Sequence, residues 1–298
     1  MNLLNKLIVT TLPVIPKPIV RKFANRYIAG EKLSDAVRVV KELNARGIMA
    51  TLDVLGESIT TKEEALVARN EILRLFPTIQ KEKLDSNVSI KLTQLGLILD
   101  KHFCLENTRM IASKAKESNN FLRIDMEDSP TTDDTIWVYR EVRKQFTNVG
   151  IVLQAYLHRT ERDADQLIKE DLGHFRLCKG IYVEPAEIAF KEHDEINQNF
   201  IQVMKKMLEK KAYLGIATHD DDLVDAAYRI IQSLKLQKSE YEFQMLLGVR
   251  EDLRDKIVRA GHRMRVYVPF GEHWYRYSIR RFKENPQIAG YVFKALFN

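Results

Sequence analysis

Residues 121–157 read FLRIDMEDSPTTDDTIWVYREVRKQFTNVGIVLQAYL, a stretch that holds one strand, one helix and a second strand. Residues 121–127 and 151–157 are short, apolar runs with branched and aromatic side chains, as in buried strands. Between them, residues 133–145 form an amphipathic run of helix length, and Thr131-Thr132-Asp133-Asp134 supply capping side chains at its start. A strand, a crossover helix and another strand predict a parallel sheet.

The same unit repeats along the whole chain. Strands are predicted at residues 48–55, 87–92, 121–127, 151–157, 175–179, 213–218, 241–247 and 264–269. Helices are predicted at residues 62–75, 107–117, 133–145, 162–169, 186–210, 222–233, 251–260 and 274–283, and Thr60-Thr61-Lys62-Glu63-Glu64 caps the first of them. Eight strand–helix units predict a (βα)8 barrel of the TIM type, an α/β fold. A doubly wound open sheet is the alternative, but Leu55-Gly56-Glu57 is not the glycine-rich turn of such sheets.

Composition limits the classes of function. The 298 residues are 45% hydrophobic and 30% charged, which is typical of a soluble globular enzyme. Basic residues outnumber acidic ones by a net charge of +6, but the two signs are interleaved and no aromatic–basic signature appears, so no nucleic acid partner is expected. Cys104 and Cys178 lack metal-ligand spacing and favour a reducing compartment, which predicts a cytoplasmic protein without a bound metal.

The first 29 residues mix apolar and basic side chains. Pro13, Pro16 and Pro18 interrupt the apolar run, and no cleavage site follows it. These features argue against a spanning helix and against a signal peptide. We expect short helices that close one end of the core, and peripheral contact with the inner face of a membrane stays open.

Reactive side chains gather at the C-terminal ends of the predicted strands, where barrels of this type place their chemistry. Strand alternation puts Lys91 and Asp125 on the faces opposite their apolar neighbours. An unpaired charge in a buried strand is costly, so these side chains predict a polar site. The simpler alternative is a structural ion pair between them. Other strand ends contribute Thr93, Glu127, Gln154, Tyr156, Arg176, Lys179, Thr218, His219, Gln244 and Tyr267.

The C-terminal stretch YRYSIRRFKENP, residues 275–286, predicts a site for a small carboxylate. On a helix Tyr277, Arg280, Arg281 and Glu284 share one face. Two guanidiniums beside an aromatic ring form a fork for a carboxylate ligand. A solvated basic helix face is the alternative.

Taken together, these motifs resemble the monofunctional bacterial proline dehydrogenases, whose catalytic domain recurs in the bifunctional proline utilisation flavoproteins. The resemblance runs from about residue 29 to the C-terminus. Its motifs, in order, are VSIKLTQLG (88–96), LRIDME (122–127), LQAYL (153–157), RLCKGIYVEP (176–185), ATHD (217–220), EFQMLLG (242–248), YVPFG (267–271) and YSIRRFKEN (277–285). It implies a single domain over residues 1–298, with an N-terminal helical segment at 1–46, the barrel at 47–298 and a final helix over the barrel mouth.

The resemblance also implies an activity. FAD is expected to bind non-covalently over the strand ends, with L-proline oxidised to 1-pyrroline-5-carboxylate by hydride transfer to flavin N5. Electrons are expected to pass to a membrane quinone, and a pyrroline-5-carboxylate dehydrogenase is an expected further partner. The reaction is the first step of proline catabolism to glutamate.

Residue roles follow from the same resemblance. Catalytic roles are expected for Lys91, Asp125, Arg176 and Tyr267. Cofactor contacts are expected from Gln154, Arg176, Cys178, Gly180, Thr218, His219, Gln244 and Glu284. The proline carboxylate is expected to contact Lys91, Arg280 and Arg281, and the pyrrolidine ring Tyr182, Leu246, Tyr267 and Tyr277. Glu57 is expected to pair with Arg280 as a gate. Cys178 and Ile181 depart from the valine and the small residue of the family pattern, and Tyr267 favours proline over hydroxyproline.

Two other enzyme classes use similar residues on the same kind of barrel. A Schiff-base aldolase would use Lys91 or Lys179 as its nucleophile, but strand alternation turns Lys179 away from the mouth. A metal-dependent hydrolase would use Asp53, His158 and His219, which lack the paired histidines of an early strand. The aldolase also leaves the two terminal arginines without a role.

Overall fold

The strands of this protein close into one parallel barrel. The computed structural model describes residues 21, 24–56, 59–275, 277 and 278. Within them, the barrel runs β1-β2-β3-β4-β5-β6-β7-β8, and the pairing of β1 with β8 closes it. The strands are β1 (Met49–Val54), β2 (Ser86–Ile90), β3 (Leu122–Ile124), β4 (Val149–Gln154), β5 (His174–Cys178), β6 (Tyr213–Ala217), β7 (Tyr241–Leu246) and β8 (Met264–Phe270). The predicted barrel is confirmed.

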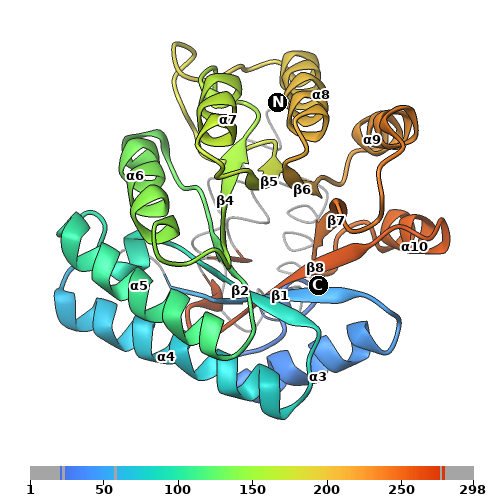
Figure 1. The fold of residues 1–298 in the computed structure, drawn as a ribbon. Helices are drawn as coiled ribbons and strands as arrows, with labels where there is room; N and C mark the ends of the chain where they lie inside the picture. Colours follow the sequence, from blue (N-terminus) through green and yellow to red (C-terminus); the bar gives the residue numbers. More distant parts are fainter. Residues whose placement is uncertain (1–20, 22–23, 57–58, 276, 279–298) are drawn as a thin grey trace, which may run out of the picture.

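Helices surround the sheet on its outer side (Figure 1). They are α3 (Leu33–Asn44), α4 (Lys62–Lys81), α5 (Lys101–Glu117), α6 (Thr132–Arg143), α7 (Thr160–Lys169), α8 (His193–Glu209), α9 (Asp221–Leu234) and α10 (Glu251–Arg259), with 3-10 turns η2 (Thr93–Leu95) and η3 (Ser129–Thr131). Helix α3 precedes the barrel in sequence and packs against β1 and β8. It therefore covers the side of the barrel where the helix after β8 would otherwise lie.

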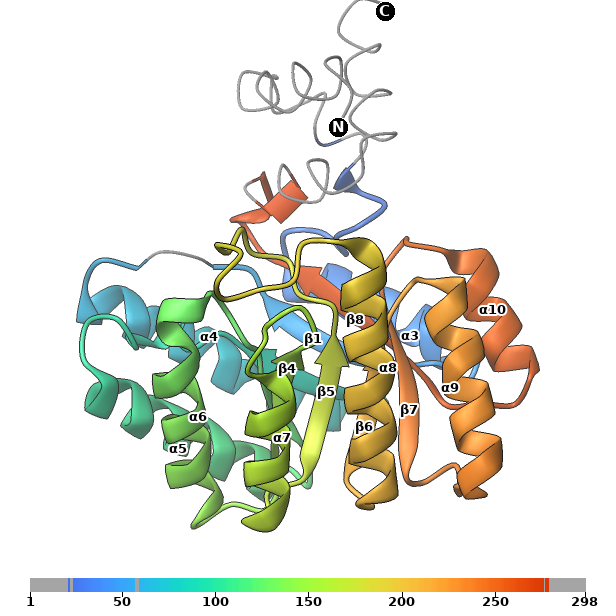
Figure 2. The same ribbon diagram turned by 90° about the horizontal axis from the view of Figure 1, so that it is seen from above.

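The chain after β8 turns to the mouth of the barrel instead. Residues 274, 275, 277 and 278 are helical, as predicted, and the rest of the predicted helix at 274–283 lies outside the described residues. Figure 2 shows this red segment above the C-terminal ends of the strands. Tyr277 is buried there.

Several predicted boundaries were wrong: α4 extends to Lys81 rather than to residue 75, and α5 begins at Lys101 rather than at residue 107. Two further boundaries differ for local reasons. The helix predicted at 186–210 begins only at His193, because residues 181–192 form a loop in which Ala189 bridges to Leu157. The strand predicted at 121–127 ends at Ile124. Beyond it Glu127 leaves the ladder and accepts hydrogen bonds from the backbone and side chain of Thr93.

The predicted caps had different outcomes. At α4, the Thr61 side chain accepts from the Glu64 backbone N–H, and the Glu64 side chain accepts from the Thr61 N–H at 3.2 Å, as in a capping box. At α6, Thr131 makes no such cap, because its hydroxyl donates to the backbone oxygen of Asp128 instead. That expectation was wrong.

The barrel wall has an apolar outer face and a polar inner face. Val88, Ile90, Leu122 and Ile124 are fully buried, and α4 and α5 pack against their strands. Burying each such side chain contributes roughly 1.5–3 kcal/mol. Alternate residues of the same strands point inward and include charged side chains, so the centre of the barrel is a hydrogen-bonded polar column.

Candidate active site

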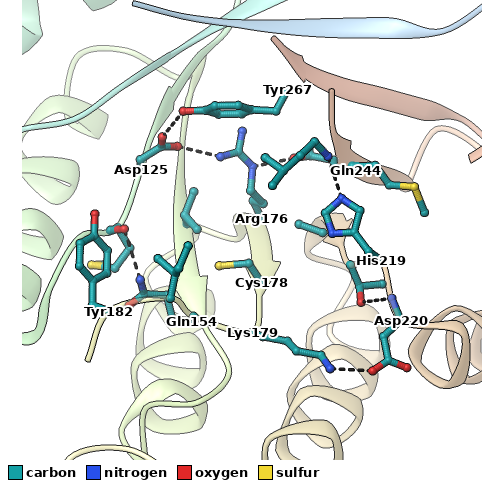
Figure 3. Close-up of a pocket in the computed structure, with 18 of the residues that line it drawn as sticks. Asp125, Gln154, Arg176, Cys178, Lys179, Tyr182, His219, Asp220, Gln244 and Tyr267 are labelled. Atoms are coloured by element: carbon teal, nitrogen blue, oxygen red, sulfur yellow. Dashed lines mark hydrogen bonds and ion pairs between the residues drawn. The ribbon is translucent and has the colours of Figure 1, made fainter. Parts of the chain in front are cut away.

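A cavity of about 620 Å³ lies at the C-terminal ends of the strands. Residues at or just beyond the ends of β2 to β8 line it, together with Tyr277 from the segment above the mouth. Figure 3 shows the labelled side chains of this cavity. Its volume is in the range of small-ligand and cofactor sites.

Asp125 is the centre of a buried charged cluster. Its Oδ1 accepts a hydrogen bond from Arg176 Nη1 at 2.7 Å, and its Oδ2 accepts one from the Tyr267 hydroxyl at 2.8 Å (Figure 3). Burial alone would raise the pKa of Asp125, but Arg176 and Lys91 outweigh burial and hold that pKa below its ordinary value. Asp125 is therefore an anion that fixes the position of the arginine and the tyrosine.

Lys91 is held mainly by a residue that strand patterning did not select. Its Nζ donates to both carboxylate oxygens of Asp53, at 3.0 and 2.9 Å, and lies 3.5 Å from Asp125 Oδ2. Burial would lower the pKa of Lys91, but Asp53, Tyr267 and Asp125 together raise it well above its ordinary value. Lys91 is thus a fixed ammonium. The alternative of an ion pair with Asp125 exists in the structure, but Asp53 is the closer partner.

From the sequence, Asp53 was expected only as a metal ligand of the alternative hydrolase. The signal that could have selected it is its place in strand β1, where a lone acid interrupts the run Met49–Val54. Asp53 is 1% exposed. A carboxylate buried so completely needs a cationic partner, and Lys91 is that partner.

Arg176 is fixed from a second side. Its Nε donates to Gln244 Oε1 at 2.6 Å, and Gln244 Nε2 donates to Glu242 Oε1 at 2.6 Å. The guanidinium carbon lies 5.2 Å from the centre of the Tyr267 ring. Two polar partners and one aromatic face leave Arg176 little rotational freedom, as a preorganised site requires.

The loop after β5 forms one wall of the cavity and carries Tyr182. Glu184 anchors this loop, because its carboxylate accepts from the Ser129 backbone N–H at 2.7 Å and from the Ser129 hydroxyl at 2.6 Å. Gly180 has φ +109°, and a Cβ there would lie 2.1 Å from the Tyr156 ring. Only glycine fits this close approach.

Strand β6 and the loop after it form the opposite wall. His219 Nε2 accepts from the Leu246 backbone N–H at 2.9 Å, which fixes that nitrogen as an acceptor (Figure 3). Lys179 lines the cavity, so its expected orientation away from the mouth was wrong. The strand ends at Cys178, and alternation does not extend past it. The Lys179 ammonium is paired with Asp220 Oδ2 at 2.6 Å.

The structure brings together most of the side chains that the sequence selected. The residues from that set that line the one cavity are Lys91, Asp125, Gln154, Arg176, Cys178, Gly180, Tyr182, Thr218, His219, Gln244, Leu246, Tyr267 and Tyr277. Glu57, Arg280, Arg281 and Glu284 lie outside the described residues. The structure therefore places the residues of the cavity wall. The expected clamp of Arg280 and Arg281 and the expected pairing of Glu57 with Arg280 stay predictions.

The residues of the cavity fit a flavin. Gln154 Nε2 donates to the backbone oxygen of Met126, while its buried Oε1 has no hydrogen-bond partner among the described residues and can accept from a bound ring. Gly180 leaves the backbone open beside the Tyr156 ring. Arg176 adds a cation beside a partly apolar lining. These features suit a planar, hydrogen-bonding ring system that becomes anionic on reduction.

Two properties of the described residues limit other interpretations. No group of three or more histidine, cysteine, aspartate or glutamate side chains in the described part of the chain could hold a metal ion. None of the helices that the structure describes combines the length and the apolar character needed to cross a bilayer.

The fold and the cavity define a class of protein: a (βα)8-barrel enzyme with a charged ligand site at the C-terminal face of its strands. Comparison with known proteins then specifies the family. A family model described as proline dehydrogenase matches residues 36–293. The chain belongs to the proline dehydrogenase family, whose members are flavin-dependent enzymes.

Individual relatives agree with this assignment. Proline dehydrogenase 2 of Bacillus subtilis is 36% identical over 277 residues, which cover 93% of this chain and 91% of that protein. Proline dehydrogenase of Deinococcus radiodurans is 35% identical and covers 92% of this chain and 89% of its own length. A crystal structure of proline utilization A from Bdellovibrio bacteriovorus superposes with a TM-score of 0.83 at 27% identity. The match covers 89% of this chain and 33% of that larger one.

Proposed function

We propose that this proline dehydrogenase oxidises L-proline to 1-pyrroline-5-carboxylate with a non-covalently bound FAD, and that a membrane quinone accepts the electrons. Family membership supports the reaction. The observation that carries the site is the buried cluster of Lys91, Asp125, Arg176 and Tyr267 at the strand ends of one cavity. When bound, FAD would supply the hydride acceptor for the carbon beside the proline nitrogen.

Lys91 is proposed to hold the proline carboxylate. Its charge is kept by Asp53, and its ammonium lines the cavity, so it can act as a permanent cation toward an anionic ligand. Arg280 and Arg281 are proposed to complete the clamp from the C-terminal helix, with Glu57 as the gate that pairs with Arg280. A clamp with three cations orients the ligand as well as binding it.

The ring of the substrate is proposed to lie between side chains of four segments. Tyr182, Leu246, Tyr267 and Tyr277 line the cavity from the β5 loop, β7, β8 and the segment above the mouth. The pKa of Tyr267 is raised well above its ordinary value, chiefly by burial and then by Asp125, so its phenol stays neutral. A neutral phenol that donates to Asp125 is a rigid wall, which favours proline over the bulkier hydroxyproline.

Arg176 and Gln154 are proposed to face the flavin, with Cys178, Gly180, Thr218, His219, Gln244 and Glu284 along the rest of the cofactor. The Arg176 guanidinium would stabilise negative charge on the reduced ring, because a fixed cation in a water-poor site interacts strongly with a developing charge. Gln154 would use its unpartnered Oε1 as an acceptor.

A Schiff-base aldolase is the second enzyme class, and the charge state of the lysines disfavours it. A nucleophilic lysine must lose its proton, but the raised pKa of Lys91 opposes that loss. Lys179 is bound to Asp220. Borohydride with substrate should therefore trap no covalent adduct on either lysine.

Partners and location follow from the proposed electron transfer. A quinone resides in a membrane, so the enzyme is proposed to work in the cytoplasm at the inner membrane face. Delivery of the product to a pyrroline-5-carboxylate dehydrogenase is proposed as the following step.

The direct test uses the absorbance of the purified holoenzyme. We expect a yellow protein whose visible flavin absorbance bleaches when L-proline is added without oxygen, with a soluble quinone restoring it. A protein that stays colourless after reconstitution with FAD, or one whose flavin is not reduced by proline, would contradict the proposal.

A further inference from the structure

The opposite end of the barrel holds a second cavity, of about 420 Å³. It lies at the N-terminal ends of the strands, the lower end of the barrel in Figure 2, and shares no lining residue with the cavity at the mouth. Its lining residues are Leu84, Asp85, Ser86, Asn87, Asn119, Asn120, Phe121, Arg123, His174, Tyr213, Glu242, Arg263 and Arg265. We refer to it as the lower cavity.

One wall of the lower cavity is a stack of three rings. Phe121 and His174 stack with centroids 4.3 Å apart, and His174 and Tyr213 stack at the same distance. The Arg123 guanidinium carbon lies 5.0 Å from the centre of the Phe121 ring. The stack thus holds a guanidinium in a fixed place at the wall.

Positive side chains outnumber negative ones in the lining of the lower cavity. Three arginines, Arg123, Arg263 and Arg265, face one buried carboxylate, Glu242, while Asp85 is exposed at the rim. Glu242 is already saturated: Arg265 donates to both of its oxygens at 2.7 and 3.1 Å, and Gln244 donates to Oε1. Its hydrogen bonds are therefore made chiefly with Arg265, and the three arginines exceed the two acids of the lining by one positive charge.

Arg123 forms no ion pair with any acid among the described residues. It is 2% exposed, and its Nη1 donates to the backbone oxygens of Ile151 and His174 at 3.1 and 2.9 Å. Its Nη2 lies 3.1 Å from His174 Nδ1, and its Nε has no hydrogen-bond partner among the described residues. Burial, followed by repulsion from Arg176, lowers the pKa of Arg123 to about 9. A buried guanidinium whose hydrogen-bond partners are all neutral is further stabilised by an anion beside it.

Arg263 supplies the second cation. Its side chain is 36% exposed, and its contact with Glu242 is long, 3.9 Å between Nη2 and Oε2. Its Nη2 otherwise contacts the Met49 sulfur at 3.4 Å. Arg263 therefore keeps donors for a ligand that enters from the solvent side.

We propose that the lower cavity binds a small oxyanion, a carboxylate or inorganic phosphate, between Arg123 and Arg263. Guanidinium groups match the paired oxygens of both ligands, and the cavity is open to water at the rim and charged within. Asn87, Asn119 and Asn120 add amide side chains around it. This site is separate from the proline carboxylate clamp and does not depend on the proposed redox reaction.

The test is calorimetric titration of the holoenzyme with inorganic phosphate, and separately with formate, at constant ionic strength. The titrations are repeated in Arg281→Met, in which the proposed carboxylate clamp at the mouth is weakened, so that binding at the mouth is recognised by its loss in that variant. We expect one saturable site per chain that persists in Arg281→Met, with affinity for the better oxyanion reduced at least ~10-fold in Arg263→Gln, because one of two guanidiniums is lost. Arg38→Gln, an exposed arginine on α3, is the charge-matched control and should bind as the wild type does.

Each result decides the proposal. Loss of binding in Arg263→Gln with normal binding in Arg38→Gln supports it, and the preferred probe identifies phosphate or carboxylate as the ligand class. No saturable binding of either probe to the wild type overturns it. Equal affinity in wild type and Arg263→Gln also overturns it, because the anion then binds elsewhere. Arg263→Gln retains Arg123 and the Arg265–Glu242 pair, so the barrel core is unchanged.

Discussion

The charge of a single lysine decides what chemistry the mouth of this barrel can perform. Lys91 is surrounded by Asp53, Asp125 and the Tyr267 hydroxyl, with Nζ 2.9 to 3.5 Å from each. Two carboxylates and a phenol oxygen retain the proton on the ammonium despite burial. The residue is thus suited to binding a carboxylate and unsuited to covalent catalysis.

Asp53→Asn tests this directly. Without the carboxylate, burial becomes the stronger influence and the pKa of Lys91 should fall, so the cation is lost as pH rises. We expect the KM for proline to rise roughly 10-fold at neutral pH and further at alkaline pH, with a smaller change in kcat. The measurement is KM and kcat between pH 6 and 9. Asp134→Asn, an exposed acid paired with Lys101, is the control. A wild-type pH profile of KM in Asp53→Asn would show that Asp53 does not set the charge of Lys91.

Arg281→Met addresses the proposed clamp, in a segment outside the described residues. If Arg281 holds the proline carboxylate, its loss should cost about 2–5 kcal/mol of substrate binding, because a carboxylate is left partly unpaired. Steady-state kinetics should show a raised KM, while the Kd for FAD changes little. Arg38→Met, at an exposed arginine of α3, removes the same charge elsewhere and should behave as the wild type. Unchanged proline kinetics in Arg281→Met would remove this residue from the site.

Strand alternation predicted which single residues point into the site. It could not predict which of these side chains form ion pairs with one another. Lys91 and Asp125 were selected because each stands opposite apolar neighbours on a buried strand. Asp53 obeys the same rule on β1 but was considered only as a metal ligand. That Lys91 pairs more closely with Asp53 than with Asp125 depends on the register between β1 and β2, in which Asp53 lies opposite Ser89, two residues before Lys91.

At the scale of elements, the loop between β5 and α8 was the least predictable segment. Residues 186–192 carry helix-forming side chains, yet they form turns that hydrogen-bond to the loop after β4. For example, the Phe190 backbone N–H donates to the Tyr156 oxygen at 2.8 Å. Tertiary contacts of this kind override local propensity, and no sequence window contains them.

Glu184→Ala tests whether this loop positions Tyr182. The substitution removes both hydrogen bonds to Ser129, one of which satisfies a backbone N–H. We expect roughly 1–3 kcal/mol lower stability and a several-fold higher KM for proline, since the wall that carries Tyr182 loses its anchor. Urea unfolding and steady-state kinetics measure the two effects. Glu187→Ala, at an exposed position of the same loop, should change neither. A stability loss with an unchanged KM would make Glu184 purely structural.

For the whole molecule, the alternation of eight strand and helix signals was enough to predict a closed barrel, because each unit is local in sequence. The hydrogen bonds inside the barrel were harder to predict from the sequence. Arg265 and Glu242 come from neighbouring strands, and Gln244 links this pair to Arg176 and so to the mouth. To predict these hydrogen bonds, one must know which inward side chains lie at the same height in the barrel. That height depends on the stagger of the strands, which the hydrophobic pattern of the sequence does not contain.

The same column predicts how the whole barrel responds to acid. Burial alone would raise the pKa of Glu242, but Arg265, Tyr213 and Gln244 outweigh burial and lower it to about 2, from an ordinary value of 4.5. A carboxyl whose pKa is lower in the folded state stabilises the fold above pH 4.5, and this contribution disappears as the pH falls from 4.5 toward 2. For a group so deeply buried, the contribution is on the order of 3 kcal/mol.

We therefore expect the free energy of unfolding in urea to fall between pH 5 and pH 3 in the wild type. The decline should be shallower in the double variant Glu242→Gln/Arg265→Met, which removes the acid without leaving a buried unpaired arginine. Glu209→Gln, on the exposed face of α8, controls for a general loss of one carboxylate and should keep the wild-type slope. If the double variant lost stability with acid as steeply as the wild type, the acid sensitivity of the fold would lie in other carboxylates, and Asp125 at the opposite end of the column would be the next to test.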